Sequence, residues 1–459
     1  MPTMVNYKRI GIAVLMALAV AGCNKDPFIS KPMPEVILGV SDNRLQQNEI
    51  HLSKDTVYVI TSNINRNAGQ KLVVDAGTLI KMSDKLSINI QPGAEIQLNG
   101  TASEPVVITS SAQKGGAGVG GGGVSGSHYW YGIRIYGNAL SQPGVSSGSI
   151  TYTRIEFAGG DENITGLPCL LLQDVTKETR LENIQVSYAF STPSFEFNGG
   201  DCNAKSLISY ASGSSDFHIR NGYKGMLQFL LAWRHPYFPA TLGFAPAQAL
   251  GGLVIEDSIS LPLISNVTVI GPGVTKETNT IYSDTISKGP FGILNGRRVA
   301  AFVTRSGAKF HIRNSAFLAF PKGGFYLDDR TTAFALNDQR ATFMYSWVHS
   351  NDTARSYYLW PDAFPPFTSK DFKELVLQPA FNNRQILNSD EFMLNNAFQY
   401  DVEPNPLPGT GSPLFSGANF DGLFSDAFFE KVAWLGAIGS DNQLRGWTNF
   451  VPLQTDYNH

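Results

Sequence analysis

The sequence predicts an all-β fold, a right-handed parallel β-helix, followed by a C-terminal capping region with short helices. Two apolar blocks return at one common step: Val186–Ala189 returns as Ile208–Ala211, and Phe195–Asn198 returns as Phe217–Arg220, each 22 residues later. Within each block, apolar residues alternate with small or polar ones, which is the period of a strand. The chain of 459 residues also holds 45 glycines, which suits a fold rich in turns.

The N-terminal residues predict an export signal. Lys8 and Arg9 precede the apolar run Ile10–Val20, which is much shorter than the roughly 20 residues of a membrane span. Small residues then lead to Cys23, and this order is typical of a signal peptide. Val20–Cys23 (VAGC) resembles the lipobox of bacterial lipoproteins, which implies cleavage before Cys23 and its acylation, including palmitate. A plain secretory peptide that happens to carry a cysteine is the alternative.

The chain divides into four predicted segments. Residues 1–22 are the signal peptide, 23–49 a proline-bearing tether, 50–355 the parallel β-helix, and 356–459 a C-terminal cap packed on the helix. The predicted strands are short apolar runs between Gly, Pro or Asn turns, and they include Thr56–Ile60, Leu72–Val74, Leu86–Ile90, Glu95–Leu98, Val106–Thr109, Trp130–Ile135, Ile155–Ala158, Val267–Ile270, Ala316–Phe320 and Phe343–Trp347.

Three further stretches interrupt or end this pattern. Residues 113–127 are rich in glycine, but no Lys-Ser/Thr pair closes them as in a phosphate-binding loop, so a surface insertion is favoured. Residues 368–378 predict a helix with Thr368 and Asp371 at the spacing of a capping box. Residues 425–432 predict a second short helix. Both helices would close the open end of the stack, because terminal strands otherwise expose unpaired backbone groups.

Composition excludes some classes of function. The formal charge of −3 and the lack of a Lys/Arg cluster argue against nucleic-acid binding. The seven histidines are scattered, without the spacing of a zinc site, and no G-x-S-x-G motif is present.

Cys169 and Cys202 could form a disulfide in an envelope compartment. Their apolar neighbours and their separation in the repeat favour two buried free thiols.

Several separate stretches together resemble a family of Bacteroidota outer-membrane lipoproteins predicted to be right-handed parallel β-helices, whose activity is unestablished. They include Gly77–Lys81, Asn99–Ser110, Ser194–Gly200, Ser265–Pro272 and Gly446–Phe450. The resemblance implies a lipid-anchored protein of the cell outer membrane, and Lys25-Asp26 after the cysteine is similar to the export tag of lipoproteins that face the exterior.

The repeat supplies a candidate site. Glu196, Asp216, His218 and Arg220 would project from it as a binding face for a glycan or a peptide, or as a surface hydrogen-bonding ladder. The relatives are acidic around residues 214–221, which implies an ion or ligand edge. Asp216 is the only acid there in this chain, so a Ca²⁺ site is weakly supported and no other cofactor or metal is expected.

Asp328 and Asp329 are the weak catalytic candidates, because glycoside hydrolysis uses paired carboxylates; a solvated corner is the favoured alternative. The sequence therefore favours a non-catalytic binding or scaffold subunit of an envelope complex. The membrane would be a partner through the lipid anchor, beside an outer-membrane transporter or assembly complex. The alternatives are a carbohydrate-active enzyme, either polysaccharide lyase or hydrolase, and an adhesin-like structural protein.

Overall fold

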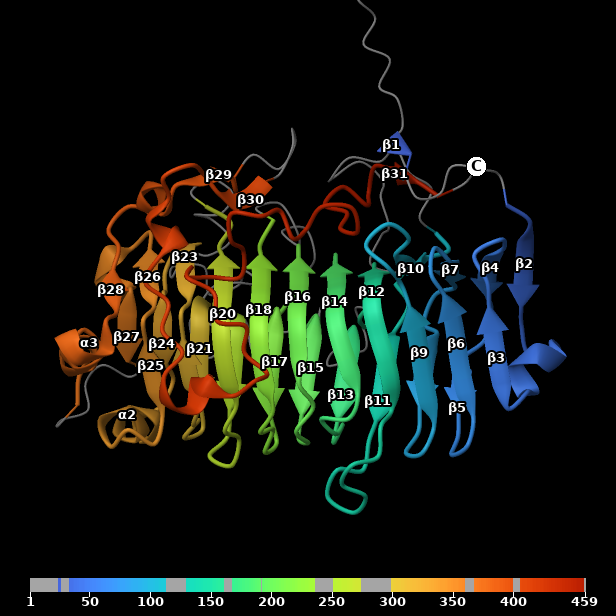
Figure 1. Ribbon diagram of the computed structural model, residues 1–459, viewed down its shortest axis with the longest axis horizontal. Coiled ribbons are helices and arrows are strands. Elements are labelled where there is room, and N and C mark those ends of the chain that lie inside the picture. Colours follow the sequence, from blue (N-terminus) through green and yellow to red (C-terminus); the bar gives the residue numbers. More distant parts are fainter. Residues whose placement is uncertain are drawn as a thin grey trace, which may run out of the picture.

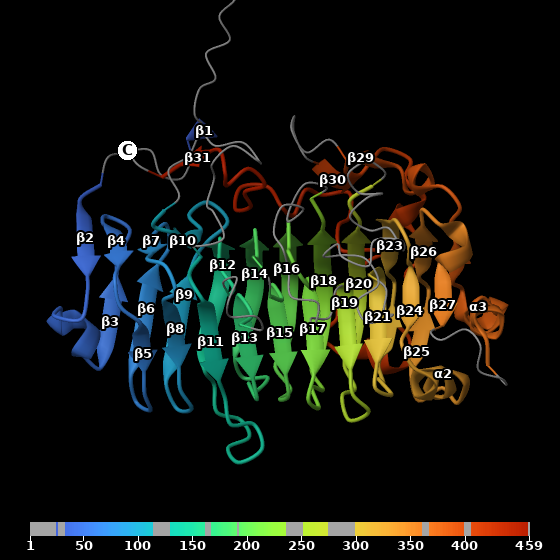
Figure 2. The same ribbon diagram turned by 180° about the vertical axis from the view of Figure 1, so that it is seen from behind.

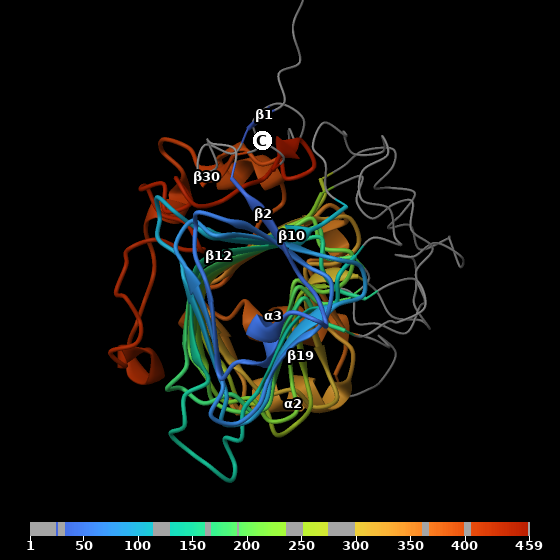
Figure 3. The ribbon, with the colours of Figure 1, turned by 90° about the vertical axis from the view of Figure 1, so that its right-hand side faces the viewer.

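The chain forms a parallel β-helix whose coils stack side by side along one axis (Figure 1). Successive coils contribute strands to three faces around an apolar core, so the predicted all-β parallel β-helix is confirmed (Figure 3). This computed structural model describes the backbone of Asn24–Lys25 and residues 33–112, 129–160, 167–190, 192–235, 251–273, 299–359, 367–398 and 405–457.

The first and second faces belong to one sheet of 17 strands, and the third face is a sheet of 10 strands (Figure 2). The first face contains β3 (Glu49–Leu52), β6 (Lys71–Asp75), β9 (Glu95–Asn99), β22 (His311–Arg313) and β25 (Thr342–Met344). The second face contains β2 (Glu35–Leu38), β4 (Val57–Ile60), β7 (Leu79–Met82), β10 (Val106–Ser110), β23 (Ala316–Phe320), β26 (Trp347–Ser350) and β28 (Arg384–Gln385). Five longer strands cross both faces: β12 (Gly148–Glu156), β14 (Arg180–Ser187), β16 (Ala204–Tyr210), β18 (Met226–Trp233) and β20 (Leu263–Ile270). The third face contains β5 (Ile64–Arg66), β8 (Ser87–Ile90), β11 (Gly132–Tyr136), β13 (Leu170–Gln173), β15 (Phe195–Asn198), β17 (Phe217–Arg220), β19 (Gly251–Glu256), β21 (Ala300–Arg305), β24 (Phe325–Leu327) and β27 (Tyr357–Leu359).

A single left-handed residue bends the chain from the first face to the second. In β14 it is Asn183, with a φ of 56°, a conformation that asparagine tolerates well. The residues that share this corner include Tyr152, Asn183, Ser206, Phe229, Asn266, Asn314 and Tyr345. The prediction of one strand over Phe343–Trp347 is wrong, because that segment covers the end of β25, the corner at Tyr345 and the start of β26.

The repeat has two steps, not one. On the third face Phe195 pairs with Phe217, so the predicted step of 22 is confirmed there. On the second face Val186 pairs with Ser209, a step of 23, so the predicted stacking of Val186 on Ile208 is wrong. The corner that follows is one residue shorter in the later coil, which restores the step of 22. Because strand side chains alternate, the slip matters: Val186 lies in the core, and Ile208 lies in an outer cluster.

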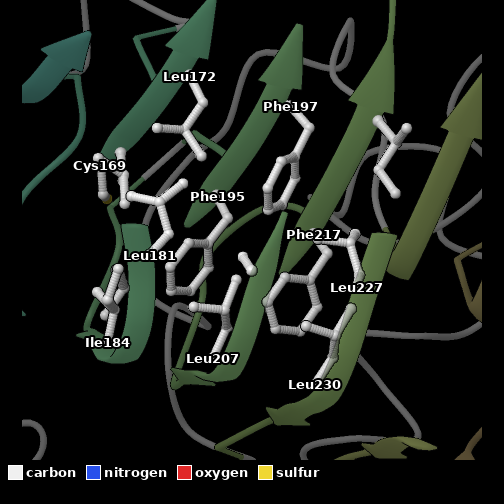
Figure 4. Packing of buried hydrophobic residues seen from close by; sticks show 14 of the residues in the cluster. Cys169, Leu172, Leu181, Ile184, Phe195, Phe197, Leu207, Phe217, Leu227 and Leu230 are labelled. Atoms are coloured by element: carbon white, nitrogen blue, oxygen red, sulfur yellow. The ribbon is translucent and has the colours of Figure 1, made fainter. Parts of the chain in front are cut away.

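The core consists of stacked rows of apolar side chains (Figure 4). Phe195 and Phe217, from neighbouring strands of the third face, stack with ring centroids 5.2 Å apart. Cys169 and Cys202 are both buried and free, so the prediction of two unbridged thiols is confirmed. Burial raises the pKa of both thiols, which makes them small hydrophobic side chains without thiolate reactivity.

The N-terminal segment is part of the fold. The tether predicted over residues 23–49 is wrong for its second half, because β2 pairs with β4 and Leu38 is completely buried. The short 3-10 helix Asn43–Gln46 adds Leu45 to the core at this end. β1 (Asn24–Lys25) pairs in parallel with β31 (Thr455–Asp456). The predicted signal peptide and Cys23 lie outside the described residues, as does the glycine-rich stretch 113–127.

The described residues contain two α-helices, α2 (Arg330–Asn337) and α3 (Ser369–Val376). The second confirms the predicted helix with its capping box: the backbone N–H of Thr368 donates to the Asp371 carboxylate at 2.8 Å, and the Thr368 hydroxyl accepts from the Asp371 N–H at 3.3 Å. Phe372 is buried in the core, so α3 covers the last coil. No helix in the described part of the chain is long and apolar enough to cross a membrane.

Residues 412–457, here called the strap, run back along the outside of the β-helix (red in Figure 1). Most of the strap packs on the second face, and the part around Asn419–Glu430 contacts Arg313 and Lys205 of the first face. Only part of the predicted C-terminal cap, including α3, therefore closes the end of the β-helix, because the strap covers its side. The helix predicted over residues 425–432 is wrong for a physical reason. The backbone N–H of Glu430 donates to the side-chain oxygen of Gln228 at 2.8 Å and so is not available for a helical hydrogen bond, and the Glu430 carbonyl accepts from the same amide at 2.9 Å. The antiparallel pair β29 (Leu394–Asn396) and β30 (Asn405–Pro408) precedes the strap.

Candidate functional site: a paired charge ladder on the third face

The outer surface of the third face carries a row of six charged side chains, here called the charge ladder. Its members are Glu196, His218, Arg220, Glu256, Arg305 and Asp328. The ladder depends on register: Glu196 pairs with His218 across β15 and β17, as the sequence predicted. Arg305 pairs with Glu256 across β21 and β19.

His218 lies between two carboxylates. Its Nδ1 is 3.4 Å from Glu196 Oε2, and its Nε2 is 3.4 Å from Glu256 Oε2. Glu196 Oε1 also accepts from Arg220 Nε and Nη2, at 3.0 and 2.9 Å, and from Asn198 Nδ2 at 2.9 Å. The imidazole of His218 thus bridges Glu196 of the preceding coil and Glu256 of the following coil. Glu196 is also held by the guanidinium of Arg220.

Arg305 extends the ladder over the next coils. Its Nη1 lies 3.3 Å from Glu256 Oε1, and its Nε lies 3.3 Å from Asp328 Oδ2. The Tyr326 hydroxyl donates to the other Asp328 oxygen at 3.4 Å. Each of the ladder's three carboxylates therefore has a cationic partner, and the six formal charges cancel when His218 is protonated.

Burial and pairing set the protonation states. The Glu196 and His218 side chains are only 4% and 8% exposed. Burial alone would lower the pKa of His218, but the carboxylates of Glu196 and Glu256 outweigh it and raise this pKa above its ordinary value. Burial alone would raise the pKa of Glu256, but His218 and Arg305 outweigh it and lower this pKa to about 2. The pKa of Glu196 is likewise lowered against its burial, chiefly by His218 and then by Arg220.

Asp216 is separate from the other predicted binding residues. Its carboxylate is completely buried; one oxygen lies 2.8 Å from Arg234 Nε, and the other accepts from the Ser209 hydroxyl at 2.6 Å. The prediction that Asp216 shares the outward face of Glu196, His218 and Arg220 is wrong. Asp216 lies in the corner before β17, where the alternation of a strand does not apply.

Asp328 and Asp329, the weak catalytic candidates, are both occupied by structural contacts. Asp329 is the N-cap of α2, and its carboxylate accepts from the Thr332 N–H at 2.8 Å and from the Thr332 hydroxyl at 2.9 Å. Asp328 belongs to the charge ladder, with a side chain only 2% exposed. The alternative of a solvated corner is therefore wrong for Asp328.

Sequence reasoning missed Glu256 and Arg305. A local signal was present, because each is the last residue of its strand and precedes a residue with positive φ, Asp257 or Ser306. Arg220 has the same position before Asn221. A polar residue just before a left-handed corner thus marks one column of the ladder, but the unequal lengths of sequence between Arg220, Glu256 and Arg305 prevent its alignment by a fixed repeat step.

The geometry does not fit the suggested Ca²⁺ edge. Calcium needs several oxygen ligands that are not already neutralised. The only acid in residues 214–221 is Asp216, which faces the guanidinium of Arg234. Within the described residues, no group of three or more His, Cys, Asp or Glu side chains could hold a metal ion.

The fold and this face define a parallel β-helix protein with a neutralised polar ladder on one sheet. Residues 44–354, more than half of the chain, match the family model described as a pectate-lyase-like β-helix domain, and the chain belongs to that family. No curated protein and no solved structure matches the chain.

Proposed function

We propose that this protein is a non-catalytic binding or scaffold subunit of an envelope complex. The observation that carries the proposal is the charge ladder, in which each carboxylate is already within 3.4 Å of a cationic group. Uronate lysis by a β-helix enzyme needs carboxylates free to bind a cation, and glycoside hydrolysis needs two carboxyl groups across the scissile bond. A ligand cation at the ladder would have to displace His218 or Arg305.

The proposed location follows from the N-terminal sequence. Lys8, Arg9 and the short apolar run before Cys23 support export, and acylation of Cys23 would anchor the protein in the outer membrane. The resemblance to Bacteroidota surface lipoproteins supports an orientation toward the exterior. In this setting the protein would help to capture nutrients beside a transporter or would assemble another surface complex.

The test is recovery of partners from native membranes. The wild-type lipoprotein is solubilised in mild detergent and isolated together with whatever is bound to it. The proposal expects a transporter or assembly protein in stoichiometric amount, which is lost from a charge-ladder variant such as Arg220→Glu. Recovery of the lipoprotein alone in repeated experiments would count against the proposal. Arg180→Glu is the matched control, because Arg180 forms a similar but exposed pair with Glu182 outside the ladder.

The family match favours a second candidate, a carbohydrate-active enzyme on the same fold. Its test is the release of oligosaccharides from a panel of acidic and neutral polysaccharides. Glu256→Gln and Asp328→Asn are the informative variants, because they preserve shape and leave the Asp329 cap of α2 intact. Release by the wild type that both variants lose would establish the enzyme and overturn the scaffold proposal.

A further inference from the structure

The strand that follows the predicted lipid anchor is fixed to the body of the protein. β1 begins one residue after Cys23 and pairs in parallel with β31, with Asn24 opposite Thr455. β31 is itself held in place, because Thr455 is buried and the hydroxyl of Tyr457 donates to the Glu156 carboxylate at 2.8 Å. One residue of extended chain spans at most about 3.6 Å, so an acyl group on Cys23 would start close to this surface.

This attachment is on the side of the stack and not at its end. Tyr457 packs on Val57, Leu79 and Val107, which belong to β4, β7 and β10, and its hydroxyl reaches β12. These strands follow β2 one after another, so the contact extends from about 5 to about 19 Å along the stack from β2. Figure 1 shows β1 and β31 over the second face with β29 and β30 on the same side, and the end view in Figure 3 agrees.

Residues 386–398 present apolar side chains outward on the same side of the β-helix. In three places a buried residue of this segment is followed by an exposed apolar one. The buried residues, which belong to the outer cluster on the second face, are Ile386, Phe392 and Ala397. The exposed residues, here called the apolar patch, are Leu387, Met393 and Phe398, with exposed fractions of 65%, 44% and 37%. The segment thus covers the second face with one set of apolar side chains and turns a second set away from the protein.

The apolar patch and the attachment of β1 are far apart along the stack. The Ile386 N–H donates to the Val348 carbonyl of β26, which is six strand spacings, or about 29 Å, from β12. Two contacts at this separation fix the direction of the axis, whereas a lipid anchor alone would let the body swing. Asp390 and Glu391, in the same segment, are also exposed, and their carboxylates would remain hydrated among lipid headgroups.

We propose that the β-helix lies with its axis along the bilayer and its second face toward it, held by the acyl chains on Cys23 and by the apolar patch. The bilayer is the partner of this surface because the anchor is attached on the same side, and acyl chains and apolar side chains enter the same layer of the membrane. The third face, with its charge ladder, is then at the side of the anchored protein (Figure 3). This inference rests on the proposed lipid anchor and specifies the surface that meets the membrane.

The test measures which side of the acylated lipoprotein touches lipid. A bimane label is attached to Met393→Cys, Leu140→Cys or Val40→Cys, and each protein is reconstituted into phosphatidylcholine vesicles whose acyl chains are brominated near the headgroup. Leu140 is exposed in the turn that joins β11 to β12, on the opposite side of the β-helix (Figure 1), and Val40 is exposed after β2, at the N-terminal end of the stack. Only the label on Met393→Cys is expected to lose most of its fluorescence.

The label is specific for the introduced cysteine. Acylation occupies the sulfur of Cys23, and Cys169 and Cys202 are buried. Quenching at Val40→Cys instead of Met393→Cys would mean that the protein stands on its N-terminal end. Quenching at Leu140→Cys would mean that the opposite side meets the bilayer, and quenching at none of the three positions would mean that the body is held off the membrane. Each of these results would overturn the inference.

Further variants separate the apolar patch from the lipid anchor. Leu387→Ser combined with Phe398→Ser is expected to relieve most of the quenching at Met393→Cys, and unchanged quenching would overturn the inference. The matched control is Ile259→Ser, because Ile259 is 64% exposed in the turn between β19 and β20, away from the patch. The vesicles contain no other protein, so this test can fail while partner recovery from membranes succeeds. A lipoprotein that does not bind the vesicles would refute both the anchor and the inference.

Discussion

Glu256→Gln is the sharpest test of the charge ladder. The substitution preserves the shape of the side chain and removes the negative charge between His218 and Arg305. His218 keeps Glu196, and Arg305 keeps Asp328, so no cation is left without a partner. The expected effect is therefore a loss of stability that depends on pH, with the fold retained.

The magnitude follows from the pKa of Glu256, which pairing lowers from its ordinary value of 4.5 to about 2. One pKa unit corresponds to about 1.4 kcal/mol, so ionised Glu256 contributes about 3 kcal/mol to the free energy of unfolding. A lowered carboxyl pKa gives stability that is present above the unfolded value and is lost as pH falls from 4.5 toward 2. The pKa of His218 is raised, so its contribution is complete below 6.5 and is lost as pH rises through the folded pKa.

The assay is urea unfolding of wild type and variant from about pH 2 to about pH 8, followed by two spectroscopic probes that must give coincident transitions. The difference between the two proteins should be largest between the two titrations, roughly from pH 4.5 to 6.5, and should shrink on both sides. The control, Glu182→Gln, removes an exposed pair with Arg180 and should cost less than about 1 kcal/mol at any pH. A difference for Glu256→Gln that does not vary with pH would refute the reasoning.

Three other substitutions test the capping box, the strap and the anchor. Thr368→Ala should lower the free energy of unfolding by about 1 kcal/mol through loss of the α3 cap, and an unchanged urea midpoint would contradict that role. Gln228→Leu removes two hydrogen bonds to Glu430, about 2 kcal/mol, so limited proteolysis should cut the strap faster while the β-helix strands stay protected; an unchanged rate would show that the strap is held elsewhere. Cys23→Ser should move the protein from the membrane fraction to the soluble fraction, and retention on membranes would refute the anchor.

The sequence predicted the fold because alternation and a repeated step are local properties. The pairing of Glu196 with His218 followed directly from the step of 22 on the third face. The charge ladder was harder to predict from the sequence, because Glu256 and Arg305 follow insertions that break the fixed repeat step. Asp216 was misplaced because alternation stops at a corner, and Asp328 and Asp329 differ by one residue yet contact an arginine and a helix N-terminus.

The sequence does indicate that a segment covers the second face, because some strands are apolar at outward as well as inward positions. Met226–Trp233 is apolar at nearly every position, although only every second side chain of a strand can point into the core. Its outward side chains, Leu231 and Trp233, are buried against other elements, and the Trp233 Nε1–H donates to the Ala397 carbonyl at 2.9 Å. An outward apolar position on this face thus indicates a covering segment. Trp347 has the same outward position in the last coils, and the chain itself covers it: its ring centroid lies 6.2 Å from that of Phe392, and Leu414 and Leu435 belong to the same cluster.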